Sequence, residues 1–388
     1  MRKAIDAALE RAGEDSRSIP GPDTLRRTDG KVRSRRIAIG DPQAPIERFF
    51  TILAEHALLG ADGRLADDVM LVSMGDHFDY GKASERARAA EGGLRILSWL
   101  AAHPCDQVVI LAGNHDLGRV GELARYEDAG FTAAQAEADA AYGDGTTDKA
   151  LEAGFLARHP DVPSAEVVAR DFSAFLARQR DLVLALLRGR RMRLAYAPAK
   201  DLLLVHAGIT TDDLETIGVG AHASAADIAD ALDDALAAAV ARWKGAPLEI
   251  PGLHRPGSAK LGEGRGILYH RPSDPAREDP ALFDGPPRRR YDPRRLPRGL
   301  VQAIGHIRDA KCRKLLAGWV AKDDSASPEG GLRSLRTDGT DVLYARGTPR
   351  DAGSSEAVML FTDGGMAHAD PDHYALLDLD ARDTAARR

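Results

Sequence analysis

The sequence predicts an α/β fold whose sheet begins with parallel strands. Three short apolar runs, at residues 36–41, 69–76 and 107–114, have the length and composition of buried strands. The two segments between them carry apolar residues at helical spacing, such as Leu94 and Leu97. Because a strand, a helix and a parallel strand form a right-handed unit, all three strands are expected to end at one edge of the sheet. Binding sites of open α/β sheets form outside that edge.

The later part of the chain alternates between helical stretches and further strand-like runs. Residues 173–189 and 224–245 carry helix-spaced apolar residues and each stretch ends at a glycine, which predicts two helices. We expect the first two later strand-like runs to pair as a hairpin and the last three to form an antiparallel meander. These later runs are residues 191–198, 201–208, 300–306, 341–347, 357–365 and 374–380.

We expect one main domain that follows a short N-terminal segment. Residues 1–35 are predicted to form a helix and then a polar arm rich in turn residues. Residues 36–388 are predicted to form the domain, and two long stretches inside it, at about 119–190 and 210–298, are predicted to be insertions.

The composition indicates a globular protein without a membrane span. The 388 residues are 44% hydrophobic and 29% charged, and they contain no apolar run of the ~18 residues that a spanning helix needs. The net charge of −6 gives no general reason to expect that the protein binds nucleic acid. Nucleic acid stays a possible but less favoured partner, because the arginine-rich residues 286–299 could attract it. The two cysteines lie far apart in sequence and the N-terminus lacks the apolar core of a signal peptide, so we expect a cytoplasmic protein.

Polar residues of a metal-binding kind follow five of the strand-like runs. A glycine precedes Asp41, Asp76, Asn114 and His306, and this glycine lets the backbone turn sharply and approach an ion closely. Carboxylate, amide and imidazole groups are suitable ligands for divalent cations. The residues at the five strand ends are Asp41 with Gln43, Asp76 with Asp79, Asn114 with His115, His206, and His306.

The order of these motifs resembles a known family. The series GDPQ, GDHFDYG, GNHD, VHAG and GH, spread over about residues 36–380, is similar to the calcineurin-like metallophosphoesterase superfamily. It resembles most the phosphoprotein-phosphatase branch, which includes bacterial diadenosine-tetraphosphatase-like enzymes. The resemblance implies a two-sheet β-sandwich flanked by helices, a four-layer αββα arrangement, for the main domain.

The resemblance also implies a catalytic centre with two divalent metal ions. Manganese is the expected metal, with iron, zinc and magnesium as alternatives. In such a centre a hydroxide shared by the two metals attacks phosphorus, and His115, oriented by Asp79, donates a proton to the leaving oxygen. Asp76 bridges the metals, and the resemblance divides the remaining ligands between a first site, with Asp41 and Gln43, and a second site, with Asn114, His206 and His306.

Gln43 stands where the family usually has a histidine, and Arg308 stands where some members have another. The first metal would then have only oxygen ligands from the protein, namely Asp41, Gln43 and Asp76. We therefore predict two unequal sites, of which the first is looser and favours Mn²⁺ or Mg²⁺ over Zn²⁺.

Tyr80 stands where the phosphoprotein-phosphatase branch has an arginine that binds the substrate phosphate. Three other arginines are candidates for this role: Arg271, Arg119 and Arg308. Arg271 is preferred because it lies in the segment where the branch has its second phosphate-binding arginine. An arginine exposed on the surface without a ligand is the competing interpretation for Arg271.

These expectations lead to a metal-dependent phosphoester hydrolase, with a phosphomonoester of unknown class as its substrate. One alternative is a phosphodiesterase or dinucleoside-polyphosphate hydrolase, in which the arginine-rich insertion would hold a longer anion. Another is a catalytically degenerate phosphatase fold that binds a phosphorylated partner, which the missing histidine and arginine favour. A role in processing nucleic-acid ends is the weakest alternative.

Overall fold

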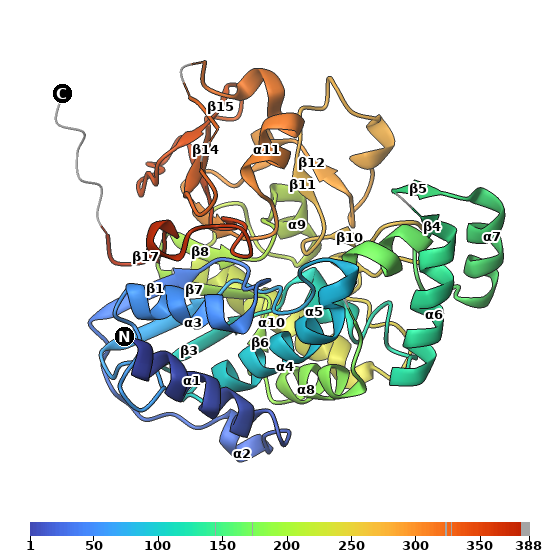
Figure 1. The fold of residues 1–388 in the computed structure, drawn as a ribbon. Coiled ribbons are helices and arrows are strands. Elements are labelled where there is room, and N and C mark those ends of the chain that lie inside the picture. The colour runs from blue at the N-terminus through green and yellow to red at the C-terminus, as the bar shows by residue number, and fades with distance from the viewer. Residues whose placement is uncertain (144, 173, 323, 327, 382–388) are drawn as a thin grey trace.

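Two β-sheets packed face to face form the centre of the computed structural model, which describes residues 1–143, 145–172, 174–322, 324–326 and 328–381 (Figure 1). The first sheet has the strand order β17-β1-β2-β3-β6. Its strands β1, β2, β3 and β6 are parallel, and β17 is antiparallel to β1. This arrangement confirms the predicted parallel beginning of the sheet. The bounds are β1 (Arg35–Ile39), β2 (Val69–Ser73), β3 (Val108–Leu111), β6 (Met192–Arg193) and β17 (Leu377–Asp378).

The second sheet has six strands, in the order β15-β14-β16-β13-β8-β7. The predicted hairpin is confirmed, because β7 and β8 pair antiparallel. The predicted terminal meander is wrong: β15 and β16 both pair with β14, and β17 leaves to join the first sheet. The bounds are β7 (Ala195–Ala199), β8 (Leu202–Val205), β13 (Val301–Ile304), β14 (Arg333–Thr337), β15 (Val342–Arg346) and β16 (Ala357–Phe361).

Successive side chains of a strand point to opposite faces of its sheet, and this alternation produces the apolar layers of the core. In β2, Met70 and Val72 pack into the cluster between the two sheets, whereas Val69 and Leu71 belong to the cluster beneath the helices. Helices therefore cover the outer faces, and the αββα expectation is confirmed. The principal helices are α1 (Arg2–Asp15), α2 (Pro22–Leu25), α3 (Ile46–Glu55), α4 (Arg86–Ala101), α8 (Ala177–Arg188), α10 (Ala225–Arg242) and α11 (Asp309–Leu316).

The two predicted insertions contain elements that stand apart from the sheets. In the first, α6 (Asp128–Ala141) and α7 (Lys149–Arg158) surround a small apolar cluster of their own and extend to one side of the molecule (Figure 1). The helix predicted at 173–189 begins in the structure at Ala177, and residue 173 lies outside the described residues. The remaining short elements are α5 (Asn114–Gly118), α9 (Thr211–Thr216), β4 (Tyr142–Gly143), β5 (Thr146–Thr147), β9 (His254–Arg255), β10 (Arg265–Gly266), β11 (Arg271–Pro272) and β12 (Arg290–Tyr291).

The boundaries of the N-terminal segment, the main domain and the insertions stay predictions. Among the described residues, no helix has both the length and the apolar character that crossing a membrane requires.

Candidate active site

The strand ends of both sheets deliver the predicted residues to one place. Asp41 follows β1, Asp76 follows β2, Asn114 begins α5 after β3, His206 follows β8 and His306 follows β13. Because the parallel strands of both sheets end on the same side, these residues come together although 265 positions separate the first from the last, and the backbone N–H of His306 donates to Asp41 Oδ2 over 2.8 Å. All of them except the fully buried His206 line a pocket of about 900 Å³, together with Gln43 and His115.

Asp76, His206 and His306 form a compact group of metal-ligating side chains. One ligand atom from each lies within 4.8 Å of the other two. The Oδ1 atom of Asn114 joins them, at 3.3 Å from Nε2 of His206 and 2.9 Å from Nδ1 of His306. This is the set of four residues that the sequence assigned to the second metal.

Two backbone carbonyls orient the histidines of this group. Nδ1 of His206 donates to the carbonyl oxygen of Met74 over 2.8 Å, and Nε2 of His306 donates to that of Tyr269 over 3.0 Å. Since a carbonyl oxygen can only accept, these nitrogens carry hydrogen. The other two ring nitrogens lie near Oδ1 of Asn114, and each can bind a cation when it carries no hydrogen, which is the arrangement that metal-ligating histidines adopt.

The electrostatics of the group favour a positive charge. Burial lowers the pKa of His206, but the carboxylate of Asp76 outweighs burial and raises it to about 10. Burial, together with the charge of Arg271, lowers the pKa of His306 well below its ordinary value. Asp76 thus favours the protonated form of His206, whereas burial and Arg271 favour the neutral form of His306. A divalent cation between the four ligand atoms would supply the charge that this proton supplies, so the donor set fits a metal.

Asp41 and Gln43 bring further oxygen atoms to the same pocket as Asp76. Oδ1 of Asp41 is buried and has no hydrogen-bond partner among the described residues. Burial and then the charge of Asp363 raise the pKa of Asp41 well above its ordinary value. Gln43 donates from Nε2 to the carbonyl oxygen of Phe78 over 3.0 Å, which leaves its amide oxygen as the end available to a cation. An unpaired carboxylate oxygen and an amide oxygen fit a hard divalent ion.

Strained and crowded backbone supports the site. Asp76, Asp79 and His306 have φ values of 55°, 68° and 66°, a region that residues other than glycine rarely adopt. A Cβ atom on Gly113 would lie 2.0 Å from Oδ1 of Asp76, and one on Gly305 would lie 1.9 Å from Oδ1 of Asp41. Glycine is therefore required at these two positions by close approach to a carboxylate.

Asp116 is a supporting residue that the sequence did not single out. Its buried carboxylate accepts from the backbone N–H groups of Asp76 at 2.9 Å, His77 at 3.1 Å and Gly113 at 2.8 Å. It thereby ties the loop after β2 to the loop after β3. Its position as the last residue of GNHD, next to the predicted acid, was the available signal.

His115, Asp79 and Arg119 form a chain of charged groups that runs from the pocket into the core. Nδ1 of His115 donates to Oδ2 of Asp79 over 2.8 Å, and the backbone N–H of His115 donates to Asp76 Oδ1 over 2.9 Å. Burial opposes a charge on His115, but Asp76 and Asp79 outweigh it and raise its pKa to about 9. The two carboxylates thus favour the protonated form of His115, with Nδ1 engaged by Asp79.

Arg119, which the sequence offered as a phosphate-binding residue, lies in the core beside Asp79. Its guanidinium is fully buried, donates to both oxygens of Asp79 over 2.6 and 2.8 Å, and packs against the rings of Phe78 and Phe172. Arg119 is not among the residues that line the pocket. The physical reason is that a buried carboxylate requires a cationic partner, and Arg119, one helical turn after His115, supplies it.

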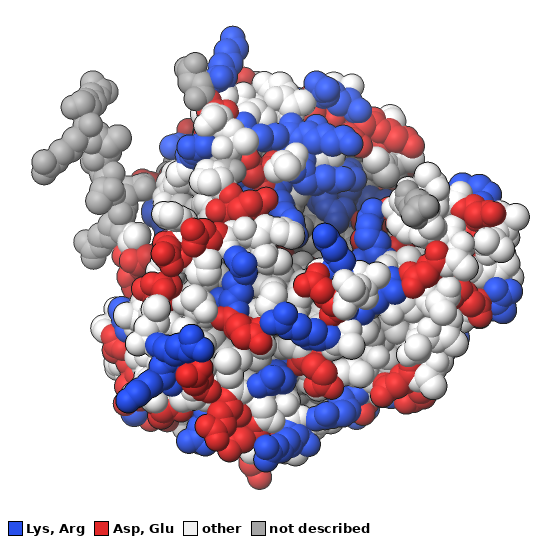
Figure 2. Space-filling model, viewed as in Figure 1, with Lys and Arg blue, Asp and Glu red and all other residues white. Residues whose placement is uncertain are grey.

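The other two predicted arginines do line the pocket. Arg271 donates from Nη1 to Oε1 of Glu263 over 3.1 Å, and Arg308 is an exposed residue at the start of α11. Tyr80, which stands at the place of the missing arginine, is buried and is not part of the lining. Figure 2 shows lysine and arginine side chains gathered around and inside a hollow on this face. Arg290 of the lining belongs to the arginine-rich run 286–299 that the sequence singled out, whereas sequence reasoning missed three other basic residues of the lining: Arg170, Lys311 and Lys314.

Comparisons with known proteins point to one family. The family model described as calcineurin-like phosphoesterase matches residues 34–278. No curated protein matches the sequence. Among solved structures, a point mutant of a cold-active protein tyrosine phosphatase is 17% identical, with a TM-score of 0.28. The match covers 59% of this chain and 53% of that one, so this chain spans about half the length of that structure.

Two further structures give similar values. The cold-active protein-tyrosine phosphatase of a psychrophilic Shewanella species is 15% identical, with a TM-score of 0.30, over 62% of this chain and 61% of that one. Another structure of a cold-active protein tyrosine phosphatase is 15% identical, with a TM-score of 0.33, over 76% and 69%.

Proposed function

Because this chain belongs to the calcineurin-like phosphoesterase family, whose members are in general metal-dependent hydrolases, we propose that it hydrolyses phosphomonoesters with the help of two divalent metal ions. The observation that carries the proposal is the convergence of Asp76, His206 and His306 on one point, with His115 and its partner Asp79 beside them.

The proposal assigns the metals to the groups described above. His206, His306 and Asn114 would hold one ion, and Asp41 with Gln43 would hold the other, with Asp76 shared between them. Two bound ions of this kind clamp a phosphate and lower the pKa of a water molecule between them. Manganese is the proposed metal because the donor set combines oxygen atoms with only two imidazoles.

His115 would act as the acid. Its Nδ1 is bound by Asp79, so the proton available for transfer is the one on Nε2, and the side chain is 17% exposed to the pocket. Donation of this proton to the leaving oxygen neutralises the charge that develops when the P–O bond breaks. Arg119 keeps Asp79 ionised and fixes its orientation, which in turn fixes the ring of His115. Arg271 and Arg308 are the proposed partners of the substrate phosphate.

A leaving-group comparison tests the acid directly. We expect His115→Gln to lower kcat on butyl phosphate by about a hundredfold or more, and on 4-nitrophenyl phosphate by much less, because nitrophenolate leaves without a proton. His222→Gln changes an exposed histidine outside the pocket and serves as the matched control. Equal losses on both esters would show that His115 does not donate to the leaving oxygen.

Metal dependence and ester type test the rest of the proposal. Turnover should vanish with a chelator, return with Mn²⁺ and be lost in Asp76→Asn, while Asp67→Asn, a change at an exposed aspartate, should retain it. Faster hydrolysis of bis(4-nitrophenyl) phosphate than of the monoester would favour the phosphodiesterase alternative. Tight binding of a phosphopeptide without any turnover would favour the non-catalytic binding module.

A cytoplasmic location remains part of the proposal, supported by two free cysteines.

A further inference from the structure

Four basic side chains from three elements form one wall of the pocket, which we call the basic wall. Arg271 lies on β11 and Arg290 on β12, and the two arginines are direct partners in the parallel pairing of these strands. Lys311 and Lys314 lie three residues apart on α11, so they share one face of that helix. All four line the same pocket as Asp76 and His306.

The members of the basic wall repel one another. Like charges directly opposite each other in a sheet are destabilising. Burial and then the charge of Arg271 lower the pKa of both Arg290 and Lys311, and Lys314 adds to the effect on Lys311. Arg271 and Arg290 are half-buried whereas Lys311 and Lys314 are exposed, so solvent screens part of this repulsion and a bound anion would relieve the rest.

The described residues neutralise the basic wall only in part. Glu263 pairs with Arg271 at 3.1 Å. Arg290 donates to the backbone carbonyl of Arg289, and its Nε is buried without a hydrogen-bond partner. Within the parts of the chain that the structure describes, no carboxylate lies within ion-pair distance of Lys311 or Lys314. Four cations and one carboxylate leave an excess of three positive charges.

Other arginines of the same segment have a carboxylate partner. Arg288 and Arg295 both pair with Asp212, and Arg294 pairs with Asp292. Arg288 and Arg295 thereby connect this segment to Asp212, whereas the pair of Arg294 with Asp292 is local. Arg290 differs from them because it faces the pocket and has no carboxylate of its own.

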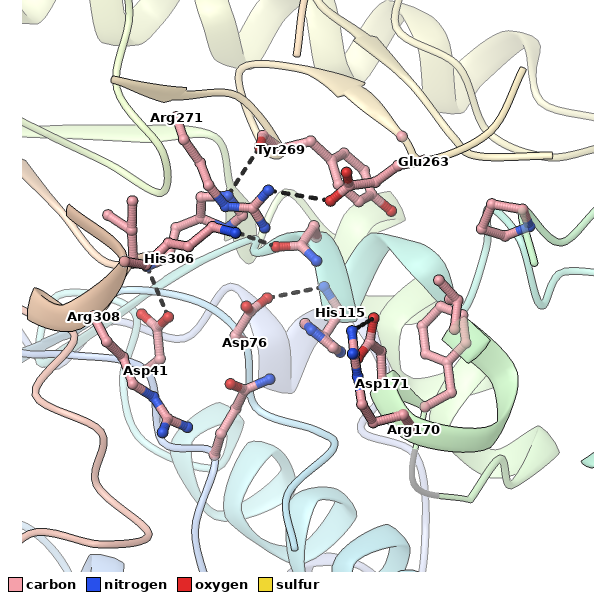
Figure 3. Close-up of a pocket in the computed structure, with 18 of the residues that line it drawn as sticks. Asp41, Asp76, His115, Arg170, Asp171, Glu263, Tyr269, Arg271, His306 and Arg308 are labelled. Atoms are coloured by element: carbon pink, nitrogen blue, oxygen red, sulfur yellow. Dashed lines mark hydrogen bonds and ion pairs between the residues drawn. The ribbon is translucent and has the colours of Figure 1, made fainter. Parts of the chain in front are cut away.

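The basic wall borders the catalytic groups. Arg271 is two residues from Tyr269, whose carbonyl oxygen holds the ring of His306. Figure 3 shows Arg271, Glu263 and Tyr269 together on the side of the pocket next to His306, with Arg170 and Asp171 on another side. A phosphoester bound at Asp76 and His306 would therefore have the basic wall beside it, within the same pocket.

We propose that Arg290, Lys311 and Lys314 of the basic wall bind a second phosphate group of the substrate while Arg271 stays beside the first, so that the preferred substrates are small phosphomonoesters that carry another phosphate on the same molecule. This inference rests on the proposed function for the identity of the first phosphate. A phosphate carries up to two negative charges and several acceptor oxygens, which match an excess of three positive charges better than one carboxylate does.

A substrate series measures this preference. The Mn²⁺-loaded enzyme is assayed for phosphate release from butyl phosphate, 4-phosphooxybutanoate and the bisphosphates of ethanediol, butanediol and hexanediol. We expect at least one bisphosphate to exceed butyl phosphate in kcat/KM by about tenfold or more after correction for its two equivalent phosphates, with the carboxylate compound between them. A preference for the carboxylate over every bisphosphate would overturn the proposal.

Two variants assign the preference to the basic wall. In Arg290→Gln/Lys311→Gln the ratio of kcat/KM values, bisphosphate over butyl phosphate, should fall about tenfold or more towards unity. Lys244→Gln removes a positive charge from an exposed residue outside the pocket and should keep the wild-type ratio. The same ratio in all three proteins would overturn the proposal.

A binding measurement separates this proposal from the proposed function. Metal-free protein is titrated calorimetrically with inorganic tripolyphosphate, and the double variant should bind it about tenfold or more weakly than wild type and Lys244→Gln. If no ester is turned over but this difference appears, the proposed function fails and the anion site stands. If esters are turned over but wild type and double variant bind tripolyphosphate equally, the anion site fails and the proposed function stands.

Discussion

Oδ2 of Asp79 lies 2.8 Å from Nδ1 of His115, and the same carboxylate receives both terminal nitrogens of the buried Arg119. One side chain thus connects a residue at the pocket to a cation in the core. The orientation of the proposed acid therefore depends on an ion pair that no substrate reaches.

Loss of the buried arginine should destabilise the fold. Arg119→Gln leaves the carboxylate of Asp79 buried without its cation, so we expect the free energy of unfolding to fall by about 3–5 kcal/mol. Arg125→Gln, which removes an exposed pair with Asp161 at 3.0 Å, should cost less than about 1 kcal/mol. Urea denaturation of both variants provides the comparison. A higher KM with unchanged stability would instead indicate the phosphate-binding role that the sequence suggested.

A methyl group at position 113 should disrupt the site. The Cβ of Gly113→Ala would lie 2.0 Å from Oδ1 of Asp76, so the carboxylate or the loop must move, and Mn²⁺ affinity should drop by about tenfold or more. Gly130→Ala, in the exposed part of α6 where a Cβ meets nothing within 4 Å, should instead raise stability by about 0.5–1 kcal/mol. Titration and thermal unfolding of both variants check the contrast, and normal Mn²⁺ binding by Gly113→Ala would contradict it.

Metal titration should reveal two unequal sites. We expect chelator-treated protein to bind two Mn²⁺ ions, the tighter one lost in His206→Gln and the weaker one lost in Gln43→Ala. The physical reason is that imidazole nitrogen is a stronger donor than an amide oxygen for this kind of ion. Replacement of Gln43 by histidine should raise the affinity of the weaker site for Zn²⁺. A single uniform class of sites in calorimetry would contradict this assignment.

Stability should depend on pH through a histidine far from the pocket. His103 accepts from the backbone N–H of Leu65 at Nε2 and donates to the carbonyl oxygen of Trp99 from Nδ1, and burial lowers its pKa from 6.5 to about 3. Between pH 6.5 and 3 the unfolded chain binds a proton that the folded chain does not. The contribution of neutral His103 to the free energy of unfolding is therefore fully present above pH 6.5. It falls by about 1.4 kcal/mol for each pH unit below that value.

Urea midpoints at pH 5 and pH 7 check this dependence. His103→Gln offers a neutral amide that can make both hydrogen bonds, so its stability should fall less between the two pH values than that of the wild type. Equal pH dependence of the two proteins would rule out His103 as the source.

The central parallel strands could be predicted because the sequence pattern of each strand and helix lies within a few consecutive residues. Three apolar runs that alternate with helical segments determine parallel strands, and polar residues directly after those runs must lie at the same sheet edge. The strand β14 was missed because Arg333–Thr337 contains two arginines and no apolar run. It becomes a strand only through backbone pairing on both sides, with β15 and β16.

The sequence by itself determined which residue types stand at the strand ends, and with them the candidate ligands and the acid. Only the tertiary structure decided what each arginine does, since Arg119 neutralises a buried carboxylate whereas Arg290 faces the pocket with no carboxylate partner. The physical reason is that the end of a strand can be located from the local pattern of apolar residues in the sequence. The balance of charge around a side chain is instead set by partners that can be distant in sequence, as Asp212 is from Arg288.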